Sequence, residues 1–279
     1  MVNRIRTLVA CFVVGLVLPS PASAAFITFE VGGDNTAASI QASVDQFRAN
    51  LGNPNNGNAP GPLAGGRREI NWDGGGSVVA SPAGNPFAGF QNNRGALFTT
   101  PGTGFLQTPL NDVALTSLNP TYATTFGFFS PVRIFTSLGS NITDVTFFIP
   151  GSLTPATVSG FGAVFTDVDL GDSASLEFFD IDGNLLFSDN VLAGTVADGS
   201  LSFLGASATA GERIFRVRIT SGTTALGPND NPTGGVDVVA MDDFIYAEPL
   251  AVPEPSILLL LGVGLIGWVT SGARARRRQ

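Results

Sequence analysis

The chain has 279 residues, of which 44% are hydrophobic and only 13% are charged, so it carries enough apolar material for a buried core. Its formal net charge is −8, all fourteen basic residues are arginines, and it contains no histidine. These absences exclude a histidine general base, a Ser-His-Asp or Cys-His nucleophile, the usual zinc sites and a Schiff-base lysine, and leave carboxylates, hydroxyls and hard cations.

The N-terminus is typical of a secretory signal peptide. Two arginines precede an apolar run at residues 8–18, and the small residues after it end in Ala-Ser-Ala. This pattern predicts that residues 1–24 are a leader, cleaved between Ala24 and Ala25. Eleven apolar residues are too few to span a bilayer, which disfavours a permanent anchor. The only cysteine lies inside the leader, so the exported chain cannot rely on disulfides.

One amphipathic helix is predicted near the start of the exported body. Four apolar residues recur at spacings of four, three and four, which places them on one helix face: Ile40, Val44, Phe47 and Leu51. Asn35 or Thr36 is the candidate cap at its beginning and Gly52 at its end. Residues 53–66, rich in Gly, Pro and Asn, then predict a long surface loop.

Beyond this loop the chain consists of short runs rich in Phe and Val, bounded by turn residues, as expected of strands. Residues 215–219 alternate apolar and arginine side chains, which predicts a strand with one buried face. Asp182-Gly183 predicts a two-residue hairpin. We therefore expect an all-β fold, an antiparallel β-sandwich or jelly roll with one short N-terminal helix. It would occupy residues 25–250 as one domain, with an N-terminal lobe at 25–110 as an alternative.

The C-terminus combines a short acidic motif, an apolar segment and a cluster of arginines. Residues 256–273 carry no charge, and 18 residues of helix cover about 27 Å, enough for the hydrocarbon core of a bilayer. A transmembrane helix is therefore predicted at residues 257–273. The arginines within residues 274–278 would stay on the cytoplasmic side, which holds the body of the protein outside. An ordinary tail anchor fits the same pattern.

These three parts, in this order, resemble the PEP-CTERM sorting signal of Gram-negative bacteria, which here covers residues 252–279. Its motif occupies residues 252–256 and begins with Val252, Pro253, Glu254 and Pro255. The resemblance implies recognition and cleavage by exosortase, an integral membrane protease, and delivery to the cell surface or extracellular matrix. The membrane helix would then be a transient anchor. The prolines favour an extended segment that a protease can reach.

The exported body is strongly acidic. Between Ala25 and Pro253, eight arginines stand against 21 acidic residues, a formal charge of −13. Such a surface repels nucleic acid and attracts divalent cations, so no nucleic-acid partner is expected.

Two segments are candidate calcium sites, because Ca²⁺ is bound by several oxygen atoms. Asp167, Asp169 and Asp172 form the first group, and Asp180, Asp182 and Asn184 form the second. For the second group a hairpin turn is the favoured alternative.

A third candidate calcium site combines acids that are far apart in the sequence. Neighbouring strand residues point to opposite faces, so one of Asp242 and Asp243 is expected to point inward or to a sheet rim. Glu30 with Asp242 or Asp243 resembles the structural calcium site of many jelly-roll carbohydrate-binding modules. A salt bridge to Arg67 or Arg68 is the alternative.

Candidate groups for sugar binding are few. Trp72 offers a ring for stacking and Asp73 an acceptor for hydroxyls, although Trp72 fits a packing role over the core equally well. Glycoside hydrolysis needs two facing carboxylates, and no spacing favours Glu69, Glu177 or Glu212.

The sequence therefore predicts a non-enzymatic exported protein of the surface or matrix that binds exopolysaccharide in a biofilm. The alternatives are a secreted carbohydrate-active enzyme that uses paired carboxylates, and a purely structural surface component.

Overall fold

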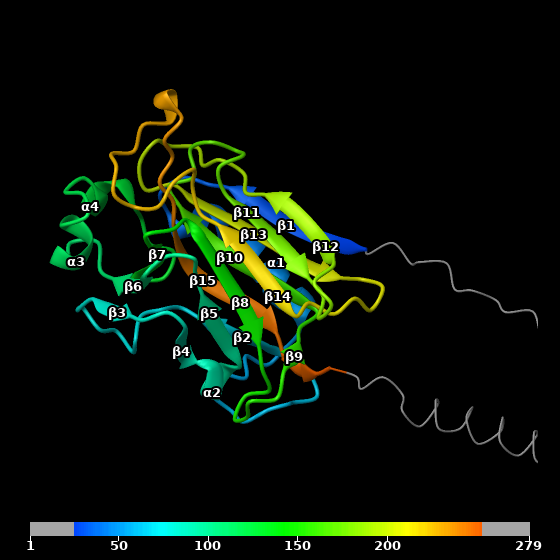
Figure 1. Ribbon diagram of the computed structural model, residues 1–279. Helices are drawn as coiled ribbons and strands as arrows, with labels where there is room; N and C mark the ends of the chain where they lie inside the picture. The colour runs from blue at the N-terminus through cyan, green and yellow to red at the C-terminus, as the bar shows by residue number, and fades with distance from the viewer. Residues whose placement is uncertain (1–24, 253–279) are drawn as a thin grey trace, which may run out of the picture.

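The computed structural model describes residues 25–252, of which 39% lie in strands and 13% in helices, so the fold is mostly β. The strands form two large antiparallel sheets packed on a common core (Figure 1). This confirms the prediction of an antiparallel β fold, while the jelly-roll connectivity stays a prediction.

The larger sheet has eight strands. In spatial order they are β1 (Phe26–Gly32), β13 (Leu201–Ala208), β10 (Gly160–Thr166), β15 (Ala240–Ala247), β7 (Ile134–Leu138), β6 (Gly104–Thr108) and β3 (Ser81–Ala83), with β2 (Arg67–Ile70) also paired to β15. Strands from residues 25–110 thus pair with strands from the second half of the chain.

The smaller sheet has six strands, in the order β12 (Leu185–Asn190), β11 (Ser175–Phe179), β14 (Arg216–Thr220), β8 (Ile142–Phe147), β5 (Ala96–Thr99) and β4 (Phe87–Phe90). A separate pair joins β9 (Ala156–Thr157) to β16 (Leu250–Ala251). The short helices are α2 (Gln91–Arg94), α3 (Val113–Thr116), α4 (Tyr122–Thr125) and the 3-10 turn η1 (Pro232–Gly234).

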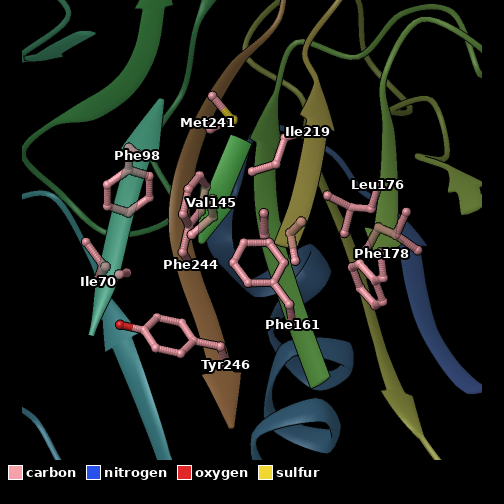
Figure 2. Close-up of a cluster of buried hydrophobic side chains, with 14 of the residues drawn as sticks. Ile70, Phe98, Val145, Phe161, Leu176, Phe178, Ile219, Met241, Phe244 and Tyr246 are labelled. Atoms are coloured by element: carbon pink, nitrogen blue, oxygen red, sulfur yellow. The ribbon is translucent and has the colours of Figure 1, made fainter. Parts of the chain in front are cut away.

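The core between the sheets is rich in phenylalanine. Phe161 of β10 and Phe244 of β15 extend from the larger sheet, and Phe178 of β11 from the smaller one, into one apolar layer (Figure 2). In β14 the side chains of Val217 and Ile219 are fully buried, whereas the two arginines of the strand face outward. The alternation predicted for this segment is therefore confirmed.

Helix α1 (Ala37–Leu51) covers the outer face of the larger sheet. Its predicted apolar stripe is the buried face, and Phe47 lies over Gly162, where an added Cβ would stand 2.8 Å from the ring. The helix begins after Thr36 and ends before Gly52, as predicted, but no side chain caps its first turn. Gly52 has a φ of 96°, which suits a residue without Cβ.

Strands β11 and β12 form the predicted hairpin. The prediction of a two-residue turn was wrong, because residues 180–184 join the two strands. The Asp180 carboxylate accepts hydrogen bonds from the backbone N–H of Asp182 (2.9 Å) and of Asn184 (2.8 Å). These hydrogen bonds stabilise the turn. They agree with the hairpin that was the alternative to a calcium site at Asp180, Asp182 and Asn184.

The loop at residues 53–66 is irregular, as predicted, and is held by a buried ion pair. Arg68 donates to Glu248 through Nε (2.7 Å) and Nη2 (2.8 Å), and through Nη1 to the carbonyl oxygen of Gly57 (2.8 Å). Asn56 donates to the same Glu248 carboxylate. The loop is thereby fixed against β2 and the end of β15.

The predicted leader at residues 1–24, most of the sorting motif, the helix at 257–273 and the arginine cluster lie outside the described residues. Within residues 25–252, no helix is both long and apolar enough to cross a membrane.

Candidate functional site

A polar pocket of about 310 Å³ opens where α1, β2 and β15 come together. Its lining carries two guanidinium groups, two carboxylates, amides and a hydroxyl, contributed by Arg48, Asn55, Gly57, Glu69, Asn71, Arg94, Ser130 and Asp243. The pocket therefore offers hydrogen-bond donors and acceptors in a small space.

A bulge in β15 directs two neighbouring carboxyl groups to one place. Ala163 pairs with Phe244, but Phe165 pairs with Met241, so Asp242 and Asp243 together fill the space of one residue. The hydroxyl of Ser130 lies 2.5 Å from Asp243 Oδ1 and 3.4 Å from Asp242 Oδ1. The expectation that these two side chains point to opposite faces was wrong, because the bulge breaks the alternation of the strand.

Both carboxyl groups are buried. Asp242 Oδ2 accepts hydrogen bonds from the backbone N–H of Phe129 (2.8 Å) and Ser130 (3.1 Å). Burial, together with the charge of Asp243, raises the pKa of Asp242 well above its ordinary value, and burial raises the pKa of Asp243 to about 6. The interaction between the two carboxyl groups raises the pKa of Asp242 and lowers that of Asp243.

Arg48 of α1 lies between the two pocket carboxylates. Its Nη2 is 2.9 Å from Glu69 Oε2 and 3.5 Å from Asp243 Oδ2. The predicted partners of the Asp242 and Asp243 pair were wrong: Arg67 binds Glu69, and Arg68 binds Glu248. Sequence reasoning missed Arg48, although it follows Phe47 on the predicted helix and so lies at the rim of its buried face.

The structure does not bring Glu30 to the other two predicted calcium ligands. Glu30 is exposed on β1, and strands β13 and β10 lie between β1 and β15. The predicted set of Glu30, Asp242 and Asp243 is therefore not assembled at one point.

Trp72 has only 1% of its surface exposed, and one ring face is stacked on Phe135 at a centroid distance of 3.7 Å. Its Nε1 donates to the carbonyl oxygen of Asp242 (2.9 Å). Asp73 is also buried and accepts hydrogen bonds from the backbone N–H of Val132 (2.6 Å) and Arg133 (3.2 Å). The predicted glycan contacts do not fit this burial, and Trp72 takes the packing role that was its alternative.

The three glutamates considered for hydrolysis lie apart. Glu69 lines the pocket, Glu177 belongs to β11 of the other sheet, and Glu212 precedes β14. Glu212 instead contacts the first residue after the predicted leader: the backbone nitrogen of Ala25 is 2.7 Å from its Oε1. At the other end, Val252 directly follows β16.

Comparison with known proteins identifies the tail and leaves the domain unmatched. The described body is a β domain, and residues 251–278 match the family model described as a PEP-CTERM protein-sorting motif, which includes Pro253, Glu254 and Pro255. Neither the curated proteins nor the solved structures gave a match.

The chain is thus a PEP-CTERM protein. It is exported and sorted by exosortase, and it is associated with the membrane during that processing.

Proposed function

We propose that the protein is a non-enzymatic component of the cell surface or extracellular matrix, which binds exopolysaccharide of a biofilm through the polar pocket. The observation that carries this proposal is the sorting motif at residues 251–278, which directly follows the folded domain. Exosortase sorting would leave the domain outside the cell, where it can contact the polymers of the matrix.

Removal of the leader is supported by the contact at its predicted cleavage site. Cleavage after Ala24 would convert the Ala25 nitrogen into an ammonium group, 2.7 Å from Glu212 Oε1. A carboxylate is thus in place to pair with the new N-terminus. Cleavage at the sorting motif would in turn remove the membrane helix predicted at residues 257–273.

The pocket geometry supports binding over hydrolysis. Glycosidases keep two carboxyl groups about 5–9.5 Å apart with the sugar or a water between them. Here the space between Glu69 and Asp243 is occupied by the guanidinium group of Arg48, which contacts both. Two carboxylates that both contact one guanidinium group are poorly placed to act as acid and nucleophile.

Arg94 makes the pocket suitable for an acidic sugar. Its side chain donates to Asn58 Oδ1 (2.8 Å) and to the carbonyl oxygen of Glu69, but it forms no ion pair with any carboxylate in residues 25–252. Its charge is therefore available to a carboxylate on a bound sugar. The pocket volume lies near the lower end of the range for small-molecule sites, about 300–1,000 Å³.

A secreted carbohydrate-active enzyme is the second candidate. Glu69 and Asp243 line the same pocket, and burial raises the pKa of Asp243 to about 6, as a general acid requires.

The test uses titration calorimetry to measure how tightly the exported protein binds exopolysaccharide purified from the cells that make the protein. Arg94→Gln should weaken binding by about tenfold, because a charge-assisted hydrogen bond is lost. Arg216→Gln removes the same charge from the outer face of the smaller sheet and should leave binding unchanged. Release of reducing ends would instead support the enzyme, and absence of binding would support a purely structural component.

A further inference from the structure

A second group of acids lies at the end of β10, away from the pocket. Asp167 and Asp169 follow the last residue of the strand, and Asp230 comes from the loop between β14 and β15. One carboxylate oxygen from each of the three lies within 4.8 Å of the other two. Asp172, the third member of the group predicted from the sequence, is exposed on the same loop and does not take part.

Within residues 25–252, one buried carboxylate oxygen of this cluster lacks a hydrogen-bond partner, as does one of a neighbouring aspartate. Asp167 has no exposed surface, and its Oδ2 accepts no hydrogen bond within the described part of the chain, while its Oδ1 accepts one from the backbone N–H of Gly199 (3.2 Å). Oδ1 of the fully buried Asp237 is unpartnered in the same way. An unpaired buried carboxylate oxygen is costly, so its presence indicates a ligand that supplies the missing contact.

Asp237 also organises the segment that carries the first two ligands. Its Oδ2 accepts hydrogen bonds from the backbone N–H of Asp169 (3.1 Å) and Leu170 (2.8 Å) and from the hydroxyl of Ser173 (2.6 Å). The loop that carries Asp169 is thereby fixed before any ligand arrives, as a preorganised site requires.

The cluster has no positive charge to balance it. None of Asp167, Asp169, Asp230 and Asp237 forms a salt bridge with an arginine anywhere in residues 25–252. A bound cation would balance the negative charge of these carboxylates.

We propose that Asp167, Asp169 and Asp230 bind one divalent cation, of which calcium is the chemical class that fits best. Oxygen ligands on opposite sides of a Ca²⁺ ion lie about 4.8 Å apart, twice its usual ligand distance of about 2.4 Å. The three carboxylate oxygens, which all lie within 4.8 Å of one another, can therefore contact one Ca²⁺ ion. Mg²⁺ requires a stricter octahedral geometry and gives up its bound water reluctantly, which favours Ca²⁺ for a site built from three carboxylates.

Such an ion joins two distant segments of the chain. It ties the end of β10 to the loop that precedes β15, and both strands belong to the larger sheet and pair with each other. The role that follows is structural: the ion fixes this end of the sandwich outside the cell, where the chain has no cysteine left to form a disulfide.

The experiment measures calcium binding to the full exported protein by calorimetry and by terbium luminescence. Tyr122 can sensitise Tb³⁺, because its hydroxyl contacts Gly227 and Pro228, close to Asp230 in the same loop. We expect a Kd of about 10⁻⁴ M or tighter for Ca²⁺. Ca²⁺ should displace Tb³⁺, whereas the same concentration of Mg²⁺ should not.

Asp230→Asn and Asp169→Asn should each weaken Ca²⁺ binding at least about tenfold, since each removes a charged ligand. Asp172→Asn is the matched control from the same loop and should bind as the unaltered protein does. Circular dichroism checks that each variant is folded, and Asp230→Asn serves alone if Asp169→Asn does not fold. The proposal is overturned if the unaltered protein shows no calcium heat, if folded Asp230→Asn binds normally, or if Asp172→Asn loses binding equally.

Discussion

Replacing Asp243 with asparagine should change how stability depends on pH. Burial raises the pKa of Asp243 from 3.8 to about 6, so between these values the folded state binds more protons than the unfolded state. Stability therefore falls as the pH rises through this window. At pH 7 the ionised carboxylate costs about 3 kcal/mol relative to an unperturbed one, at about 1.4 kcal/mol per pKa unit.

Lowering the pH from 7 to 5 should recover about 1.3 kcal/mol of this cost in the unaltered protein. Asparagine imitates the protonated carboxyl group and can still accept the Ser130 hydrogen bond, so Asp243→Asn should lack this gain. Urea unfolding of both proteins at the two pH values isolates the contribution of this carboxyl pair as a difference of differences.

Asp45→Asn is the control, because Asp45 contacts the same Arg48 (3.2 Å) from an exposed position. It should keep the pH dependence of the unaltered protein. If Asp243→Asn also keeps that dependence, the buried carboxyl group does not hold its proton in the way described.

Three further changes test the packing. Arg68→Met leaves the buried carboxylate of Glu248 unpaired and should cost about 3–5 kcal/mol in urea unfolding, whereas Arg218→Met on the outer sheet face should cost less than about 1 kcal/mol. Phe135→Ala removes the ring stacked on Trp72 and should lower the free energy of unfolding by about 3–5 kcal/mol. It should also shift tryptophan emission to the red, and an unshifted spectrum would contradict the stack. Gly162→Ala places a Cβ 2.8 Å from Phe47 and 2.9 Å from the Gly205 backbone. The free energy of unfolding, measured in thermal melts, should therefore fall by about 1–3 kcal/mol. An unchanged stability would mean that α1 is not packed there.

Local patterns in the sequence were sufficient to predict the local structure. The stripe from Ile40 to Phe47 marks α1, and the alternation around Val217 marks β14, because burial of one face repeats with the period of each element. The hairpin around Gly183 was predicted for the same reason, but its length was not, since the Asp180 side chain stabilises a longer turn.

The candidate sites depended on contacts that no local pattern reports. Asp230 joins Asp167 from a loop more than sixty residues away, so spacing pointed instead to the nearby Asp172. The side-by-side position of Asp242 and Asp243 depends on a bulge opposite Val164, which their own sequence does not reveal. Such features follow from strand pairing and register, which are properties of the whole sheet.

The most direct test is the intact mass of the protein recovered from the surface or medium of the cells that make it, compared with cells that lack exosortase. We predict a product that begins at Ala25 and ends at or beside the motif of residues 252–256, formed only when exosortase is present. Recovery of the full 279-residue chain inside the cell, unchanged by loss of exosortase, would contradict export and sorting.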